Sequence, residues 1–361
     1  MAIRFLRNSL MAAAALLALA GFVNFEVDPF QQYRVPTTHE ARFYRAFQRY
    51  EDPGIARHYE YDRAIISSSL MENVSGSEVD RAFGSGKTMN LCLSAMTAYD
   101  GRKVLEVALE SRPLKQVLYS VDYNAFSGDP GRVGYGKLPL YLYDTARWND
   151  YPYLLSSGTL GRSLDIVLDW REGQFRTDAD NPWYWADDGT GFGAKKVIDE
   201  LDLANINGRY KQPQRTMEGM WASFEANVEP LVRAHPQTEF IFIWPPYSIF
   251  VWIDFARRDQ LDVSLEFKRR FVLAMSKYPN VRIHDFQERT DWIMDLAEYR
   301  DIYHYSPKIS SQLVKDVAAG KDEITPENVD ARNAELRTIA TTADIGKIVA
   351  EARAAPVASP R

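Results

Sequence analysis

Short apolar runs alternate with amphipathic segments through most of the chain after about residue 60. The short runs predict β-strands, and the amphipathic segments between them predict helices. The predicted strands cover 61–67, 88–93, 117–121, 239–244 and 281–286. The predicted helices cover 71–83, 99–111, 217–234, 261–277 and 306–319.

Strands separated by helices indicate an α/β fold, with a parallel sheet of about five strands covered by helices on both faces. We expect this α/β domain to span residues 61–320 and a helical tail to follow over 321–361. In open parallel sheets, ligands bind at the carboxyl ends of the strands. Candidate chemistry is therefore sought where each predicted strand ends.

A long connection between the third and fourth predicted strands, about 126–215, fits no simple helix and is rich in aromatic and acidic residues. Connections of this length usually form lids or binding insertions. Trp183 and Trp185 are candidates for a platform that stacks on sugar rings, and packing of the insertion onto the core is equally compatible. The acidic residues of 178–188 are better explained by a solvated loop than by a calcium site.

The amino terminus combines positive charge with an apolar run. Arg4 and Arg7 precede 14 apolar residues, Leu10–Val23, and Glu26 and Asp28 follow. This charge order places the N-terminus in the cytoplasm. Fourteen residues are short for a membrane-spanning helix, which needs about 20.

Two interpretations of residues 1–27 remain, an uncleaved signal anchor and a signal peptide cleaved near Ala18-Leu19-Ala20. Phe22, Phe25 and Val27 extend the apolar character and favour the anchor. Either one places the rest of the chain outside the cytoplasm. Residues 28–60 then form a juxtamembrane stretch.

Composition narrows the range of functions. The chain has 361 residues, a formal net charge of −6 and a single cysteine, with 46% hydrophobic residues. The negative charge argues against a nucleic-acid partner. One cysteine excludes multi-cysteine metal sites, and the scattered histidines have no ligand spacing, so we expect neither a metal nor a cofactor.

Two short segments carry candidate chemistry. Ser69 follows the first predicted strand at a turn into a helix, where backbone amides can stabilise an oxyanion. Asp301 and His304 form an Asp-x-x-His segment before the last helix. The carboxylate can hold one ring nitrogen of the histidine, which leaves the other to take a proton from a serine. Together they predict a serine-based acyl transfer site.

The turn serine and the late Asp-x-x-His resemble the SGNH (GDSL-like) hydrolase family, especially a membrane-anchored extracytoplasmic branch distantly similar to the proteins of alginate O-acetylation and lipoteichoic-acid D-alanylation. The resemblance also involves Val27–Phe30 and Phe242–Ser248. It implies a flavodoxin-like three-layer sandwich. It assigns Ser69 as nucleophile, His304 as general base and Asp301 as its orienting group.

The oxyanion-hole segments of the family depart from its usual pattern here. Where the family has a glycine before the nucleophile, this chain has Ser67. Where the family has a glycine after the second strand, this chain offers Ser94. The third-strand asparagine corresponds to Asn124, which is equally compatible with a simple turn role. Tyr247 is a further candidate for substrate binding.

The sequence therefore predicts an extracytoplasmic serine esterase or O-acyltransferase that acts on acyl esters of a cell-envelope polysaccharide or other glycan. It would be held in the cytoplasmic membrane or, after signal cleavage, secreted, and a multi-span membrane acyltransferase is an expected partner. The alternative is a catalytically impaired protein of the same fold that binds glycans or serves in assembly. The missing glycines favour this alternative.

Overall fold

The protein is described by a computed structural model that covers residues 1–170, 175–207 and 215–354. Its core is one sheet of five parallel strands in the order β2-β1-β3-β4-β5. The strands are β1 (Arg63–Ile66), β2 (Thr88–Asn90), β3 (Gln116–Ser120), β4 (Glu239–Trp244) and β5 (Val281–Asp285). The predicted α/β class with about five parallel strands is confirmed.

The strands are apolar because the sheet is buried on both faces. In β4 every residue after Glu239 is buried, which explains why its sequence is continuous in hydrophobicity rather than alternating. The register is regular, with Ile66 opposite Tyr119 and Ser120 opposite Ile243. The carboxyl ends of β1, β3 and β4 therefore lie at one edge of the sheet.

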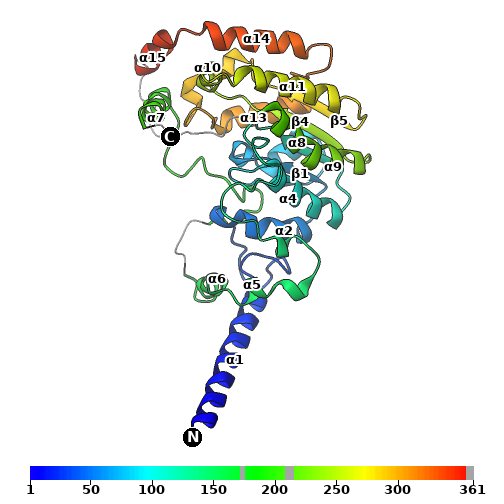
Figure 1. The fold of residues 1–361 in the computed structure, drawn as a ribbon, viewed down its shortest axis with the longest axis vertical. Coiled ribbons are helices and arrows are strands. Elements are labelled where there is room, and N and C mark those ends of the chain that lie inside the picture. The colour runs from blue at the N-terminus through cyan, green and yellow to red at the C-terminus, as the bar shows by residue number, and fades with distance from the viewer. Residues whose placement is uncertain (171–174, 208–214, 355–361) are drawn as a thin grey trace.

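Helices cover both faces of this sheet (Figure 1). Right-handed crossovers place the helices that follow β2, β3 and β4 on one face and those that follow β1 and β5 on the other. In agreement, α8 contacts both α4 and α11, and α3 contacts α13. These helices are α3 (Gly76–Phe83), α4 (Ala98–Ser111), α8 (Met217–Asn227), α11 (Leu261–Met275) and α13 (Pro307–Ala318).

The helix predicted over 217–234 is two helices, α8 and α9 (Glu229–Ala234). They meet at Val228, whose φ of −117° departs from helical geometry. Pro230 follows within the first turn of α9. Proline has no amide hydrogen and clashes with the preceding turn, so a continuous helix is disfavoured at this point.

Residues 28–60 are part of the folded body. They include α2 (Gln48–His58), which packs against α4 and is buried along most of its length. Gly54 of α2 allows the closest approach: a Cβ on it would lie 2.2 Å from the carbonyl oxygen of Gln31. A glycine is therefore required where the chain passes over this helix.

The connection between β3 and β4 contains helices that the sequence pattern did not predict: α5 (Tyr151–Leu154), α6 (Ser157–Val167) and α7 (Ala194–Asn207). In α6 the buried face carries Thr159, Ser163 and Ile166, whereas Leu164 and Val167 are exposed. The two glycines of α6, Gly158 and Gly161, together with its Ser and Thr residues, give this segment a weak helix signal in the sequence. Residues 171–174 and 208–214 of the predicted insertion lie outside the described part of the chain.

The ends of the chain are also helical. The predicted helical tail contains α14 (Val329–Thr342), which packs on α10 (Ile249–Arg257) and α11, and α15 (Ile345–Ala354), which packs on α7. At the other end, α1 (Ala2–Val27) projects from the body (Figure 1). It is long and apolar enough to be a membrane span or a signal sequence.

Candidate active site

The structure brings Ser69, His304 and Asp301 together at the carboxyl edge of the sheet. Ser69 Oγ lies 2.8 Å from His304 Nε2, and His304 Nδ1 lies 2.6 Å from Asp301 Oδ2. The serine and the histidine are 235 residues apart in the sequence. A nucleophile, a base within hydrogen-bond reach and a carboxylate that orients the base form the arrangement needed for acyl transfer.

Ser69 is positioned by the turn that follows β1. It begins a short 3-10 helix, Ser69–Met71, and the amide of Leu93 beyond β2 donates to the carbonyl of Ser67 at 2.9 Å. Ser67 is fully buried and does not adopt a left-handed backbone conformation. The turn therefore accepts a Cβ at the position where the resemblance led us to expect a glycine.

Asp301 is held as an ionised carboxylate. Its Oδ1 accepts the backbone amides of Tyr303 and His304, each at 2.8 Å, while Oδ2 faces the imidazole. Burial by itself would raise the pKa of the Asp301 carboxyl. The hydrogen bonds and the charge of His304 outweigh burial, and the pKa of Asp301 is lowered below its ordinary value.

The aromatic segment of the connection packs on this triad. The indole of Trp185 donates to the carbonyl of Ser69 at 3.1 Å, and its ring meets the His304 ring edge-on with centroids 5.4 Å apart. Asn73 Oδ1 accepts the amides of Trp185 and Ala186, which ties the segment to the chain just beyond the nucleophile.

Two predicted substrate contacts are corrected. Trp183 is fully buried and donates to the carbonyl of Asn90 at 3.0 Å, so it presents no ring face to a sugar. Tyr247 is also fully buried, and its hydroxyl donates to Asp122 at 2.8 Å. Both rings pack the insertion and the strand ends against the core. For Trp183 this is the alternative to a sugar-stacking platform, packing of the insertion onto the core.

The segment after β2 differs from the expected donor arrangement at Ser94. The Ser94 amide donates to Gln48 Oε1 at 2.8 Å, so it already has an acceptor. The next residue, Ala95, adopts the left-handed conformation with φ of 52°. This is the backbone region that favours glycine. The glycine-like position of this turn is therefore Ala95 rather than Ser94.

Asn124 lies in a buried polar network beyond β3. Its Oδ1 accepts Arg215 Nη1 at 3.1 Å, and a hydrogen bond from its side chain to the Tyr303 hydroxyl opposes the effect of burial, which raises the pKa of that tyrosine. The backbone amide of Asn124 donates to Asp122 Oδ1 at 2.9 Å. Burial raises the pKa of the Asp122 carboxyl above its ordinary value. The Asn124 side chain thus already has two partners within the protein, Arg215 and Tyr303.

Glu72 links the nucleophile turn to residues that the sequence did not single out. It is fully buried three residues after Ser69 and accepts hydrogen bonds from Arg45 at 2.7 Å, Gln48 at 2.8 Å and the Ser94 hydroxyl at 2.7 Å. The sequence near Arg45 and Gln48 carries no motif that links them to Ser69. Both residues lie in the stretch 28–60, which was predicted to be juxtamembrane.

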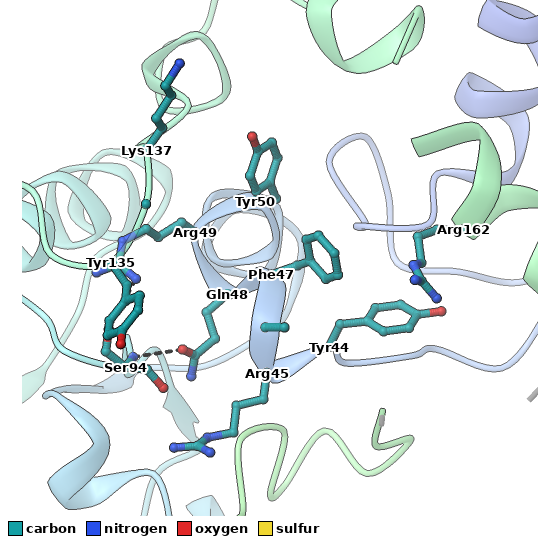
Figure 2. Close-up of a pocket in the computed structure, with 12 residues that line it drawn as sticks. Tyr44, Arg45, Phe47, Gln48, Arg49, Tyr50, Ser94, Tyr135, Lys137 and Arg162 are labelled. Atoms are coloured by element: carbon teal, nitrogen blue, oxygen red, sulfur yellow. Dashed lines mark hydrogen bonds between the residues drawn. The ribbon is translucent and has the colours of Figure 1, made fainter. Parts of the chain in front are cut away.

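Two cavities adjoin this linkage. One of about 850 Å³ is lined by aromatic and basic residues and by no carboxylate (Figure 2). The side chains are those of Tyr44, Arg45, Phe47, Gln48, Arg49, Tyr50, Ser94, Tyr135, Lys137 and Arg162. A second cavity of about 650 Å³ is lined by both Arg45 and Trp185. Arg45 is common to the two, and Trp185 connects the second one to the triad.

The acidic residues of the insertion have protein partners. Asp180 accepts the amide and the hydroxyl of Ser77, Arg176 pairs with Asp187, and Arg300 pairs with Asp188 at 2.8 Å. Within the described ranges, no three His, Cys, Asp or Glu side chains are grouped so as to hold a metal ion. Cys92 is fully buried, and burial raises the pKa of its thiol, which makes it unreactive.

Comparison with known proteins assigns no family to this chain. No family model and no curated protein matches the chain. A solved structure provisionally described as a platelet activating factor from Streptococcus pneumonia is 11% identical, with 76% of this chain and 92% of that chain covered and a TM-score of 0.39. A likeness this distant carries no argument about the reaction, which rests on the site itself.

Proposed function

We propose that this protein is a membrane-anchored, extracytoplasmic serine esterase or O-acyltransferase of the SGNH type that acts on acyl esters of a cell-envelope glycan. The observation that carries the proposal is the hydrogen-bonded series Ser69 Oγ, His304 Nε2, His304 Nδ1, Asp301 Oδ2. The order of these residues along the chain matches the family that the sequence resembles, because the serine follows the first strand and Asp-x-x-His comes late in the chain.

The proposed reaction has two steps. Ser69 Oγ attacks the ester carbonyl while His304 Nε2 takes its proton, and collapse of the tetrahedral intermediate expels the alcohol, which receives that proton. Water or a sugar hydroxyl then attacks the acyl-serine, again with His304 as base, and Ser69 is released. Asp301 stabilises the imidazolium that forms in each step.

Backbone amides are the oxyanion donors in this proposal. Among the described residues, the amides of Ser69 and Ala95 donate to no acceptor in the protein. The bond from Leu93 to Ser67 holds the two turns that carry them side by side. Preorganised amides of this kind stabilise the developing negative charge and require no reorganisation.

The two cavities support a glycan as substrate. Aromatic rings offer faces for the apolar sides of sugar rings, and the guanidinium groups of Arg45 and Arg162 offer donors for hydroxyl and acyl oxygens. Trp185 brings the second cavity to the triad. A glycan in these cavities, which share Arg45, would have its acylated unit directed past Trp185 toward Ser69 in this proposal.

The N-terminal helix supports the proposed extracytoplasmic location of the α/β body. Arg4 and Arg7 at its start and Glu26 at its end match an anchor with its N-terminus in the cytoplasm and the α/β body outside. An exported acyltransferase needs an acyl donor, and in this proposal a multi-span membrane acyltransferase supplies it. If the segment is cleaved instead, the same body is secreted.

A glycan-binding protein with impaired catalysis is the second candidate. Two observations favour it: the Ser94 backbone amide donates to Gln48, and the Asn124 side chain already bonds the Tyr303 hydroxyl. Both groups that the family resemblance implies as oxyanion donors thus have partners within the protein. Binding of a glycan that survives loss of Ser69 and His304, without any hydrolysis, would support this candidate.

The test is labelling of the purified full chain with a fluorophosphonate, which reacts with an activated serine. We expect labelling and hydrolysis of a soluble acyl ester in the wild type and loss of both in Ser69→Ala and in His304→Ala. The reason is that Ser69 provides the attacking oxygen and His304 removes its proton.

A matched control is Ser77→Ala, because Ser77 is an exposed serine whose hydroxyl bonds Asp180 and not a base. This variant should label like the wild type. Absence of labelling in a folded wild-type protein would overturn the catalytic proposal in favour of the binding role. Labelling that persists in Ser69→Ala would show that another serine reacts.

A further inference from the structure

Helix α6 has its apolar stripe on the outside. Leu164, Val167 and Leu168 are exposed, with Val167 at 61%, and the half-buried Leu160 continues their row at helical spacing. The opposite face is buried and carries Thr159, Ser163 and Ile166. Two of the three buried residues of α6 are thus small and polar, while three large apolar residues at its end are exposed to the outside.

Aromatic residues extend this exposed surface. Trp148 is 83% exposed, Tyr151 is 62% exposed and Trp170 is 53% exposed. We call Trp148, Tyr151, Leu155 and the outer face of α6 with Trp170 the α5–α6 surface. Exposed tryptophan and tyrosine beside an apolar patch are typical of the boundary between a bilayer and water.

The α5–α6 surface lies where α1 enters the body (Figure 1). Asn24 of α1 is fully buried, donates to the carbonyl of Leu154 at 2.8 Å and accepts from the Ser163 hydroxyl at 2.9 Å. A Cβ on Gly21 would lie 3.4 Å from Leu155 Cδ2. These contacts fix both short helices against the end of α1.

The length of α1 decides which partner covers this surface. Residues 1–19 are exposed, and contact with the body begins at Ala20. Ala20 is 13 residues from Arg7, which a helix covers in about 20 Å. The hydrocarbon layer is about 30 Å thick, so a bilayer that starts at Arg7 must also reach the part of α1 that α5 and α6 flank.

Basic residues stand at the same level. A cavity of about 400 Å³ is lined by Phe25, Tyr33, Arg34, Arg147 and Leu154. The Arg34 guanidinium stacks 4.7 Å from the Phe25 ring centroid, and that of Arg147 stacks 4.8 Å from the centroid of Tyr33. Arginines beside apolar surface and at the end of a span match the position of lipid phosphates.

From these observations we infer that the α5–α6 surface is a lipid-binding platform that lies in the outer interface of the membrane crossed by α1, with Arg34 and Arg147 facing lipid phosphates. This places the last turns of α1 and the α5–α6 surface that flanks them at the same depth, in the outer part of one bilayer. It also fixes the orientation of the body, and thus the direction in which the active site faces, relative to the membrane. The inference depends on the anchor part of the proposed function and not on the chemistry.

The test measures depth with nitroxides on the full chain in lipid nanodiscs. Labels at Leu164→Cys and Val167→Cys are compared with Leu16→Cys on α1 and with Thr338→Cys, an exposed site on α14 at the far end of the molecule (Figure 1). The native Cys92 is buried and will not react. We expect the first three labels to gain contact with oxygen and lose contact with a water-soluble nickel complex, and Thr338 to show the reverse.

Each other outcome has a distinct meaning. If Leu164 and Val167 behave like Thr338 while Leu16 is immersed, the platform is wrong and the anchor stands. If Leu16 is also in water, the anchor itself fails. Protection of Leu164 and Val167 in native membranes but not in pure lipid would replace the bilayer with a membrane protein as partner.

A second variant tests the apolar contact itself. Leu164→Glu with Val167→Glu should make a nitroxide at Leu168→Cys lose its protection from nickel, because two carboxylates cannot enter the interface at this depth without cost. Thr338→Glu serves as the matched control and should leave the Leu168 label protected. Hydrolysis of a soluble ester should persist in both, which separates this result from a failure of the proposed catalysis.

Discussion

Asp301 uses both carboxylate oxygens in different ways. Oδ2 orients the His304 ring, and Oδ1 closes the Asp301–His304 turn by accepting two backbone amides. The three-residue spacing therefore has two functions, since it folds the turn and places the imidazole. The same spacing makes this pair recognisable in a sequence, whereas its serine partner comes from the other end of the chain.

Replacing Asp301 with Asn tests the orienting role. We expect kcat/KM for a soluble ester to fall by about 10⁴-fold, because an amide can neither hold the required tautomer nor stabilise the imidazolium. Fluorophosphonate labelling should slow in parallel. Unchanged kcat/KM in Asp301→Asn would show that the carboxylate is only a turn residue.

The same variant predicts a pH dependence of stability. The pKa of Asp301 is lower in the folded protein than its ordinary value of 3.8. The ionised carboxylate therefore stabilises the fold above that value, and this stabilisation is lost as the pH falls toward the folded pKa. The difference in the free energy of unfolding between wild type and Asp301→Asn should be constant above about pH 5 and shrink below about pH 4. Denaturant titrations at several pH values measure it.

Helix α2 shows how an element outside the strand-helix alternation contributes to the site. Its residues Gln48 and Arg49 line the larger cavity, and Gln48 holds the Ser94 amide. Its position depends on the close passage of the chain at Gln31 over Gly54. The stretch predicted to be a juxtamembrane connection is thus a wall of the proposed substrate groove.

A pair of helical glycines tests this packing. A Cβ on Gly54 would lie 2.2 Å from a backbone oxygen, whereas one on Gly161 in α6 meets nothing within 4 Å. Gly54→Ala should lower the free energy of unfolding by about 1–3 kcal/mol or more, because backbone must move. Gly161→Ala should be neutral or raise it by about 0.5–1 kcal/mol. Equal effects in denaturant unfolding would contradict the assigned close contact.

At the scale of the whole molecule, the arrangement links an apolar helix to the α/β body that carries the Ser69–His304–Asp301 site. The exposed stripe of α6 and the stacked arginines Arg34 and Arg147 lie on the side where α1 emerges. The α/β sheet stands beyond this end of the body (Figure 1). An enzyme built in this way would work on a glycan near the membrane surface.

The direction of insertion can be measured with reporters fused after Arg361. Alkaline phosphatase, which folds only outside the cytoplasm, should be active, and β-galactosidase should be inactive, because Arg4 and Arg7 hold the amino terminus inside. Replacing both arginines with Glu should weaken this preference. An active β-galactosidase fusion of the unchanged chain would contradict the orientation. The mass of the mature chain distinguishes an anchor from a cleaved signal.

The sequence by itself determined the elements whose signals are local. All five strands were predicted within three residues at each end, since parallel strands buried on both faces are continuous apolar runs. Ser69, Asp301 and His304 were identified because a turn after a strand and a three-residue spacing are visible in one dimension. The apolar N-terminal segment was visible for the same reason.

Only the tertiary structure decided what depends on contacts between distant segments. Whether Ser69 meets His304, which amide Gln48 occupies and which tryptophan is buried are set by packing across more than 40 residues of sequence. Helix α6 was missed because Gly158, Gly161 and the Ser and Thr residues of its short sequence have weak intrinsic helix propensity, and its contacts with α1 stabilise it in the folded protein. Local residue patterns define strands, turns and spacings. Burial and hydrogen bonding between distant segments bring the residues of the site together, and these depend on the whole fold.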